Sequence, residues 1–271
     1  MKSLIYNCFR QVIISLHKIK GFRLLNIFGL RIKIHPETIF PNYRKFPLPR
    51  KSHKSEIVRY ADYVQIHSII DLISRLGSNP VVVEIGAHHG AYAVMLGKAV
   101  EKNAGKVIAV EPNPSSFELL RNNIELNALE KVVICERVAI TDRNCELTIT
   151  DSGVQSSIKA NSDCSSVPVK AITLSDLLRK HAVDKVSLLL VDVEGAELDV
   201  LRGFPWSTMP VEAVFCEMHA YAWKDFGYTG PEFSRFLKDK GYRCFDMYFN
   251  EYDKLPNEGY LGPCILIADR R

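Results

Sequence analysis

The sequence predicts an α/β domain built around a doubly wound, mostly parallel β-sheet. Apolar segments such as VVVEIG, at 81–86, and VSLLLVD, at 186–192, lack the polar alternation of a half-exposed strand, which indicates strands buried on both faces. Amphipathic helical segments separate these strands, an alternation typical of parallel sheets linked by right-handed crossovers. The chain has 271 residues, 47% of them apolar, and is long enough to bury the core that such a sheet requires.

The predicted elements follow in order along the chain. The first part contains a helix at 56–76 that ends at Gly77, a strand at 81–86, a helix at 90–101, a strand at 106–112 and a helix at 115–127. A capping box, Ser115-x-x-Glu118, opens the last of these helices. A strand at 132–135, a hairpin candidate at 145–150, a Ser-rich loop at 151–167 and a short helix at 174–180 come next. The remainder adds a strand at 186–192, a helix at 195–202 stopped by Gly203, a strand at 211–217, a helix at 231–240 stopped by Gly241, and strands at 242–248 and 263–268.

A basic amphipathic extension with a Pro-rich linker, residues 1–54, precedes the main domain at 55–271. The extension carries twelve Lys or Arg and one acid, a charge of +11, so the remainder carries −7 of the total +4. Apolar residues recur at helical spacing from Ile5 to Ile19, which predicts a cationic surface helix too short in its apolar runs to span a bilayer. We expect it to pack on the domain or another subunit, to bind an anionic membrane peripherally through residues 1–34, or to contact a polyanion.

A glycine turn follows the first strand of the domain, in the pattern Glu84-x-Gly86-x-x-x-Gly90. The next strand ends at Glu111, 21 residues after Gly90, where a carboxylate can accept two hydrogen bonds from a ribose diol. Neither G-x-G-x-x-G nor a phosphate-binding G-x-x-x-x-G-K-[ST] is present, which favours an adenosine-containing ligand that is not rich in phosphate. S-adenosylmethionine fits best, with its carboxylate on the loop N–H groups and its sulfonium near carboxylates or aromatic faces. The predicted cofactor contacts are Glu84, Gly86, Ala87, His88, Gly90, Glu111, Pro112, Val138, Ala139 and Asp192.

The segments VVVEIGAHHGAY, VIAVEPNPSSFELLRNNIELN, ERVAITD, ITLSDLL, LLLVDVEGAELDVLRGF and FCEMH occur in this order. This order resembles the FkbM family of S-adenosylmethionine-dependent methyltransferases over about residues 80 to 220, and D-V-E-G-A-E followed by V-L-R-G is its most specific part. The resemblance implies the class I, Rossmann-like methyltransferase fold, with a seven-stranded sheet whose last strand is antiparallel, and methyl transfer usually to oxygen. His88 and His89 depart from it, because such loops more often carry Asn and an aliphatic residue there.

Acidic residues gather where two neighbouring strands of this fold end. Asp192 and Glu194 follow one strand, and FCEMH delivers Glu217 and His219 to the same edge. Methylation of a hydroxyl requires a base, and histidine is best suited to that role at neutral pH. We predict His219 as the base, oriented or made more basic by a carboxylate, with Asp192 and Glu194 positioning the acceptor hydroxyl.

Each of these residues also has a structural interpretation. Glu194 could cap the following helix, and His219 could be a buried hydrogen-bonding group. Glu197 is expected to face solvent or to pair with an arginine, without a catalytic role. No metal is assigned, although three carboxylates and an imidazole would also suit a divalent cation.

The sequence therefore predicts an S-adenosylmethionine-dependent O-methyltransferase that acts on a saccharide, a glycolipid or another small metabolite. One alternative is an RNA methyltransferase, which the absence of an N/D-P-P-aromatic motif disfavours, and another is a non-catalytic S-adenosylmethionine-binding protein. Ser156 and Ser157, on the long loop, are expected to line the acceptor pocket or to face solvent. Seven cysteines without a C-x-x-C pair indicate a cytoplasmic location, and nothing in the pattern indicates the oligomeric state.

Overall fold

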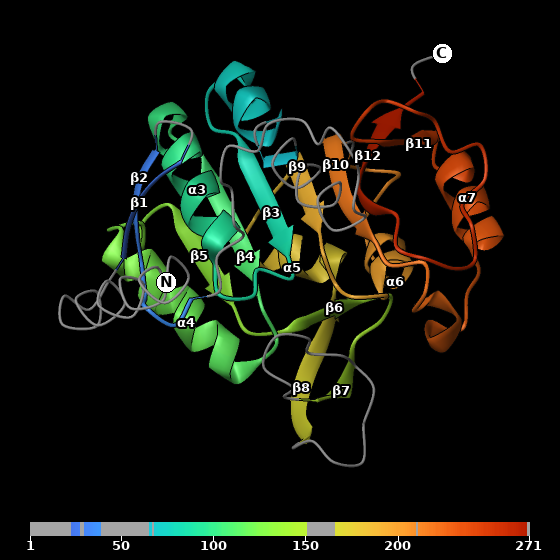
Figure 1. The fold of residues 1–271 in the computed structure, drawn as a ribbon, viewed down its shortest axis with the longest axis horizontal. Helices are drawn as coiled ribbons and strands as arrows, with labels where there is room; N and C mark the ends of the chain where they lie inside the picture. The colour runs from blue at the N-terminus through green and yellow to red at the C-terminus, as the bar shows by residue number, and fades with distance from the viewer. Residues whose placement is uncertain are drawn as a thin grey trace, which may run out of the picture.

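A central β-sheet crosses the molecule, with helices on both of its faces (Figure 1). The computed structural model describes residues 23–27, 30–38, 65, 66, 68–150, 166–209 and 211–269. The predicted basic helix near the N-terminus, most of the Pro-rich linker, Ser156 and Ser157 lie outside these residues.

The sheet has seven strands in the order β11-β12-β10-β9-β3-β4-β5. Their bounds are β3 (Val81–Ile85), β4 (Lys106–Val110), β5 (Val133–Glu136), β9 (Val186–Val191), β10 (Val211–Met218), β11 (Tyr242–Asp246) and β12 (Gly262–Ala268). All neighbours are parallel except that β12 runs antiparallel to both β10 and β11. The predicted doubly wound fold with an antiparallel last strand is confirmed.

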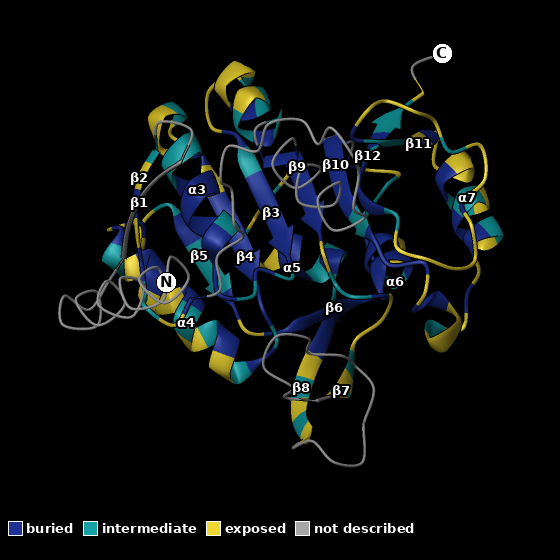
Figure 2. Cartoon of the chain, in the orientation of Figure 1, coloured by how far each residue is buried: buried dark blue, intermediate teal, exposed yellow. Residues whose placement is uncertain are grey.

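Helices cover the two faces of the sheet separately, and the central strands β3, β4, β9 and β10 are mostly dark blue, that is buried, in Figure 2. The helices are α3 (Ala91–Val100), α4 (Pro114–Leu126), α5 (Leu174–Lys180), α6 (Glu197–Arg202) and α7 (Gly230–Asp239), with 3-10 turns η1 (Glu101–Asn103) and η2 (Trp223–Phe226). Helices α3 and α4 pack with Val82 in one apolar cluster, and α5, α6 and α7 pack with Val83 in the other. Because successive strand residues point to opposite faces, β3 joins both layers of the core. No helix in the described ranges is long and apolar enough to cross a membrane.

A second, three-stranded sheet lies beside the central one, in the order β6-β8-β7. Its strands are β6 (Ala139–Thr141), β7 (Cys145–Thr150) and β8 (Ser166–Thr173). The hairpin candidate at 145–150 forms the single strand β7. Its antiparallel partner is β8, which follows the Ser-rich segment. Strand β6 pairs in parallel with β8. Residues 138–141 thereby lie along the edge of the central sheet where the candidate active site is found.

An antiparallel hairpin, β1 (Arg23–Ile27) and β2 (Leu30–Ile34), lies within the predicted extension and was not expected from the sequence. It runs alongside α3 and α4 in Figure 1, and Ile32 and Ile34 are fully buried. The side chain of Asn127 clamps the backbone of Lys33, accepting from its N–H at 2.8 Å and donating to its carbonyl at 2.5 Å. This part of the extension is therefore docked on the domain.

The N-terminus of α4 differs from the prediction. The helix begins at Pro114, and the side chain of Asn113 accepts hydrogen bonds from Ser115 N at 2.9 Å and Ser116 N at 3.1 Å. Asn113 is therefore the N-cap, and the predicted capping box at Ser115 is wrong. A proline at the first helical position and an asparagine just before it are both favoured at helix starts.

Candidate active site

The loops after β3 and β9 meet where the strand order reverses. Gly86 has a φ of 90°, and a Cβ added there would lie 1.7 Å from the carbonyl oxygen of Asp192. The N–H of Asp192 in turn donates to Ile85 O at 2.9 Å. Glycine is therefore required because two backbone segments touch at this point, which also fixes Asp192 beside the glycine turn.

The backbone amides of the glycine turn are used within the protein. Gly86 N and Ala87 N donate to Val110 O at 3.0 and 2.9 Å, and Gly90 N donates to Ala87 O at 2.7 Å. His88 N donates to Glu111 Oε2 at 2.8 Å. Each of these four amides already has an acceptor within the protein, so the expectation that loop amides hold the cofactor carboxylate stays a prediction.

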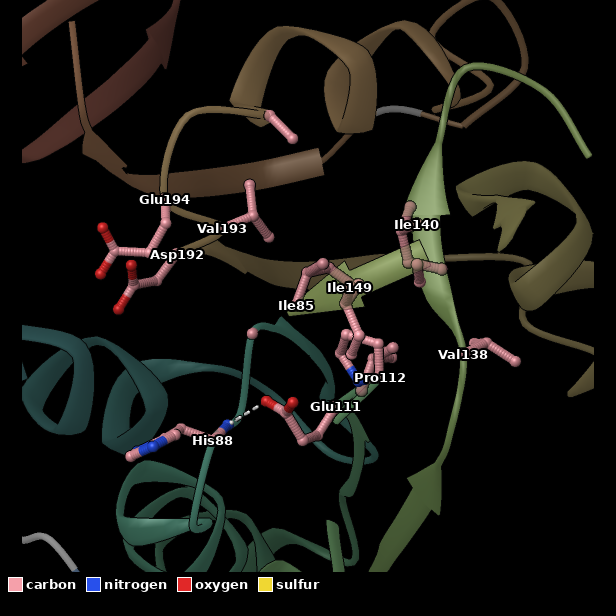
Figure 3. A pocket seen from close by; sticks show the side chains of 14 residues that line it. Ile85, His88, Glu111, Pro112, Val138, Ile140, Ile149, Asp192, Val193 and Glu194 are labelled. Atoms are coloured by element: carbon pink, nitrogen blue, oxygen red, sulfur yellow. Dashed lines mark hydrogen bonds between the residues drawn. The ribbon is translucent and has the colours of Figure 1, made fainter. Parts of the chain in front are cut away.

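Glu111 lies just beyond the end of β4 and is 5% exposed. Its Oε2 accepts from His88 N, drawn as a dashed line in Figure 3, and its Oε1 accepts from Asn113 N at 2.7 Å. Burial raises the pKa of Glu111 to about 7, against the opposing effect of these two hydrogen bonds. The two backbone donors hold the carboxylate in a fixed orientation at the cavity wall.

A cavity opens at this edge of the sheet, and Figure 3 shows Glu111 and His88 on one side of it and Asp192 and Glu194 on another. Its lining consists of Ile85, Gly86, His88, Val110, Glu111, Pro112, Val138, Ala139, Ile140, Ile149, Asp192, Val193, Glu194 and Ala196. Most of the predicted cofactor residues are among them. Glu84, Ala87 and Gly90 are not.

Glu84 is buried in β3 and does not line the cavity. It is 4% exposed, and its Oε2 has no hydrogen-bond partner among the described residues. Burial, followed by the charge of Glu111, raises the pKa of Glu84 to about 8. The carboxyl is therefore mostly neutral at pH 7, which avoids a second buried charge beside Glu111.

The structure brings together the four predicted catalytic residues. His219 is 2% exposed, and its Nε2 lies 3.5 Å from Glu194 Oε2, 3.8 Å from Glu217 Oε1 and 4.0 Å from Asp192 Oδ1. The pairing of β10 with β9 places Cys216 opposite Val191, so the strand ends that carry these groups are neighbours. Burial raises the pKa of Glu217 against the opposing effects of Tyr260 and His219. The Asp192 side chain is about half exposed, and desolvation together with the neighbouring carboxylate of Glu217 raises its pKa.

Glu197 corrects the sequence interpretation, because it is fully buried and contacts the imidazole directly. Its Oε1 accepts from His219 Nδ1 at 2.7 Å and from Gly195 N at 2.9 Å, and its Oε2 accepts from Trp223 Nε1 at 2.8 Å. The expectation of a solvent-facing or arginine-paired residue is wrong. Glu197 lies three and four residues before the buried Val200 and Leu201, and this spacing on the apolar helix face was the signal that could have identified it.

The electrostatics of His219 follow from this partner. Burial disfavours the charged imidazolium. The hydrogen bond to Glu197 and the negative charges of Glu197, Asp192 and Glu194 outweigh burial and raise the pKa of His219 to about 9. His219 is therefore protonated in the free protein at pH 7.

Two tyrosines that the sequence analysis did not identify complete the cluster. Tyr221 Oη donates to Glu194 Oε2 at 3.0 Å, and Tyr260 Oη donates to Glu217 Oε1.

Glu194 does not cap α6, because the N-cap is Ala196 without any side-chain cap bond. The capping alternative for Glu194 is therefore wrong.

The cluster has the chemistry of either a proton acceptor or a cation site. Asp192, Glu194 and His219 can each offer a ligand atom, and these atoms lie within 4.8 Å of one another. Carboxylates with one imidazole suit Mg²⁺, Mn²⁺ or Zn²⁺. The two uses exclude each other at His219, because an ion would occupy the lone pair that a base requires.

The chain is similar to known methyltransferases. The family model described as "Methyltransferase FkbM domain" matches residues 84–244, more than half of the chain. Methyltransferase sdnD of Sordaria araneosa is 27% identical over 63% of this chain and 76% of its own length. Hexuronic acid methyltransferase AglP of Haloferax volcanii is 26% identical over 55% of this chain and 60% of its own length. A solved structure of methyltransferase FkbM from Methylobacillus flagellatus is 12% identical, with a TM-score of 0.46 over 80% of this chain and 56% of that one.

The residues present fit the cofactor of such an enzyme. Glu111 presents a fixed carboxylate to a ribose diol, Val138 and Ile140 offer an apolar wall to an adenine, and Asp192 and Glu194 place negative charge for a sulfonium. The chain belongs to the FkbM family of methyltransferases, and its cofactor is S-adenosylmethionine.

Proposed function

We propose that this enzyme methylates a hydroxyl oxygen on a saccharide, a glycolipid or another small metabolite. The observation that carries the proposal is the buried imidazole of His219 at the cofactor edge of the sheet. Its Nδ1 bonds to Glu197, and its Nε2 faces Asp192 and Glu194, two residues that line the cavity. AglP, a hexuronic acid methyltransferase by name, supports the saccharide class, although not the charge of the sugar.

In this proposal Glu197 sets the tautomer of the base. Because its carboxylate accepts from Nδ1, the neutral imidazole carries its proton there and presents the Nε2 lone pair to the acceptor hydroxyl. Nε2 takes the hydroxyl proton as the oxygen attacks, a contribution of about 10²- to 10⁴-fold for a well-placed base. When bound, S-adenosylmethionine supplies the methyl group. Asp192 and Glu194 stabilise positive charge at the cavity wall and accept hydrogen bonds from the acceptor.

The pKa of His219 gives this scheme a pH dependence. Below about 9 the imidazolium predominates in the free protein, and only the neutral form can take a proton. We therefore expect kcat/KM to rise as the pH increases from 6 to 9.

The test is the variant His219→Gln, measured with S-adenosylmethionine carrying a labelled methyl group and a panel of methyl glycosides. We expect methyl transfer to fall about 10²- to 10⁴-fold, while S-adenosylhomocysteine binds as in the wild type by calorimetry. His181→Gln is the matched control, because His181 also pairs with a glutamate, at 2.7 Å from Glu136, but stands at the C-terminal end of α5, outside the cluster around His219. Full activity of His219→Gln on the glycosides would overturn the proposal.

A further inference from the structure

Two partly exposed tyrosine rings flank His219, one from each of two neighbouring loops. Tyr221 follows β10 and is 46% exposed, and Tyr260 precedes β12 and is 39% exposed. Their ring centroids lie 5.8 and 5.4 Å from that of His219, with interplanar angles of 90° and 46°. Aromatic rings of this size are usually buried, so two exposed rings beside a catalytic imidazole indicate a binding surface.

The two loops are fixed relative to each other. Tyr221 N donates to Gly259 O at 2.8 Å, and Leu261 N donates to Met218 O at 3.1 Å. These backbone bonds continue the pairing of β10 with β12 beyond the ends of the strands. The rings therefore stand on a rigid support.

The hydroxyls of both rings are also held. Tyr221 Oη donates to Glu194, and Tyr260 Oη donates to Glu217. Each ring is thus attached at its backbone and at its tip, which leaves its edges or faces for a ligand. The two rings and the carboxylates that accept from their hydroxyls form one surface around Nε2 of His219.

The chemistry of this surface selects its ligand. Asp192, Glu194 and Glu217 offer several hydrogen-bond acceptors in one place, which suits a molecule with several hydroxyl donors. The rings offer apolar faces to the C–H groups of a ring. An alkyl chain lacks the donors, and a phosphate or carboxylate would meet like charges. A neutral sugar ring satisfies both requirements.

We propose that Tyr221 and Tyr260 form the acceptor subsite of this enzyme, where they hold a neutral, polyhydroxylated sugar ring with one hydroxyl directed at Nε2 of His219. This proposal rests on the proposed function and adds to it the residues that bind the acceptor and the charge that the acceptor ring carries at the subsite. It assigns the two tyrosines a role in specificity, whereas His219 acts on the proton.

Binding is measured without turnover, by saturation-transfer difference NMR on protein saturated with S-adenosylhomocysteine. The probes are the methyl glycosides of glucose, galactose and mannose, the open-chain polyol glucitol, and methyl glucuronide. We expect at least one neutral glycoside to bind, with the strongest signals on the C–H groups of one ring face. Glucitol and methyl glucuronide should bind about fivefold or more weakly. Absence of binding by all three glycosides, or equal binding of the glucuronide, would overturn the proposal.

Pairs of variants separate the ring from its hydroxyl. Tyr221→Ala and Tyr260→Ala should each weaken glycoside binding about tenfold, the effect of losing one aromatic contact. Tyr221→Phe and Tyr260→Phe keep the ring and should retain most of the affinity. Tyr248→Ala removes a tyrosine that is 50% exposed outside the cluster and serves as the control. Wild-type binding by both alanine variants, or equal losses in the phenylalanine and alanine variants, would show that the rings do not hold the sugar.

The failure of this subsite can be distinguished from the failure of the proposed function. If the tyrosine variants bind glycosides normally while the wild type methylates a hydroxyl, only the subsite is wrong. If no hydroxyl compound is methylated, the proposed function is wrong whatever the variants bind. Binding of S-adenosylhomocysteine and the melting temperature of each variant show that the fold and the cofactor cavity are intact.

Discussion

The variant Glu197→Gln tests whether the buried carboxylate controls the charge and tautomer of His219. Glu197 is fully buried and accepts from three donors, namely Gly195 N, His219 Nδ1 and Trp223 Nε1. Glutamine has the same shape but only one acceptor oxygen, so its NH₂ group must face at least one of these donors. Leaving a buried donor unsatisfied costs about 1–3 kcal/mol.

The magnitude of the electrostatic change follows from the pKa. The pKa of His219 is about 9 against an ordinary 6.5, and each tenfold change in a proton equilibrium is worth about 1.4 kcal/mol, so the folded protein stabilises the imidazolium by roughly 3 kcal/mol. This stability is fully present below pH 6.5, because the folded pKa is raised above the unfolded value, and it is lost as the pH rises through about 9. Removing the charge of Glu197 should remove a large part of it.

The assay is urea unfolding at pH 6, 7.5 and 9.5, with Glu118→Gln as the control because Glu118 is 65% exposed on α4. The wild type should lose more unfolding free energy than Glu197→Gln between pH 6 and 9.5, since other titrating groups contribute equally to both. Methyl transfer should fall about 10²-fold or more in Glu197→Gln, and its pH profile should shift to lower pH. Parallel stability curves and an unchanged pH profile for the two proteins would refute the reasoning.

Four further outcomes are expected. Glu111→Gln should weaken S-adenosylhomocysteine binding in calorimetry, and wild-type binding should weaken below pH 7, because the pKa of about 7 leaves less carboxylate to accept from the ribose. Gly86→Ala should lower the unfolding free energy by about 3 kcal/mol or more, since its Cβ overlaps Asp192 O at 1.7 Å; a normal melting temperature would contradict this. EDTA should leave methyl transfer unchanged if Nε2 of His219 acts as the base, whereas loss restored by Mg²⁺ or Mn²⁺ would assign the cluster to a metal. Within residues 1–34, the part that precedes the docked β1–β2 hairpin, residues 1–22, should promote flotation with anionic liposomes, and equal flotation of a chain lacking residues 1–22 would exclude that role.

The central sheet could be predicted from the sequence because its strands are buried on both faces. A continuous apolar run such as that of β9 has one stable environment in a soluble domain, between two layers of helices. The meeting of Asp192 with His219 followed from the same topology, since neighbouring parallel strands end at one edge. The doubly wound sheet followed from the apolar pattern, whereas the placing of these two strand ends side by side followed from the class I fold that the family resemblance implied.

The parts that were missed depend on tertiary contacts. In β2, Ile32 and Ile34 are buried while Arg31 and Lys33 are exposed, a period of two that marks a strand. The positive charge of the surrounding segment concealed this alternation. Asn113 became the cap of α4 because Pro114 already fits the first helical position, whereas the sequence pattern at Ser115 offered a competing start two residues later. Tyr221 and Tyr260 could not be located, because their proximity depends on an antiparallel strand near the end of the chain.

The three acids of D-V-E-G-A-E are explained by the backbone turn between them. Glu194 has a φ of 52° and Gly195 a φ of 118°, so the chain reverses before α6 begins. A left-handed glutamate costs about 1–3 kcal/mol, and it persists because neighbouring contacts determine the turn. Tyr228 Oη donates to Gly195 O, and a Cβ at Gly195 would lie 2.7 Å from Ala222 Cβ.

This reversal places the carboxylates on different sides of one imidazole. Glu197 bonds to Nδ1 of His219 at 2.7 Å, whereas Glu194 and Asp192 lie 3.5 and 4.0 Å from Nε2. A regular helix through these positions would have turned Asp192 away from Glu194 and Glu197, because only residues three or four apart share a helix face. The turn instead gives His219 one hydrogen-bonded carboxylate at Nδ1 and further carboxylates at 3.5–4.0 Å from Nε2. The backbone conformation of Glu194 and Gly195 therefore belongs to the arrangement that we propose for catalysis, because it lets Glu197 reach His219 from the same strand end that carries Asp192.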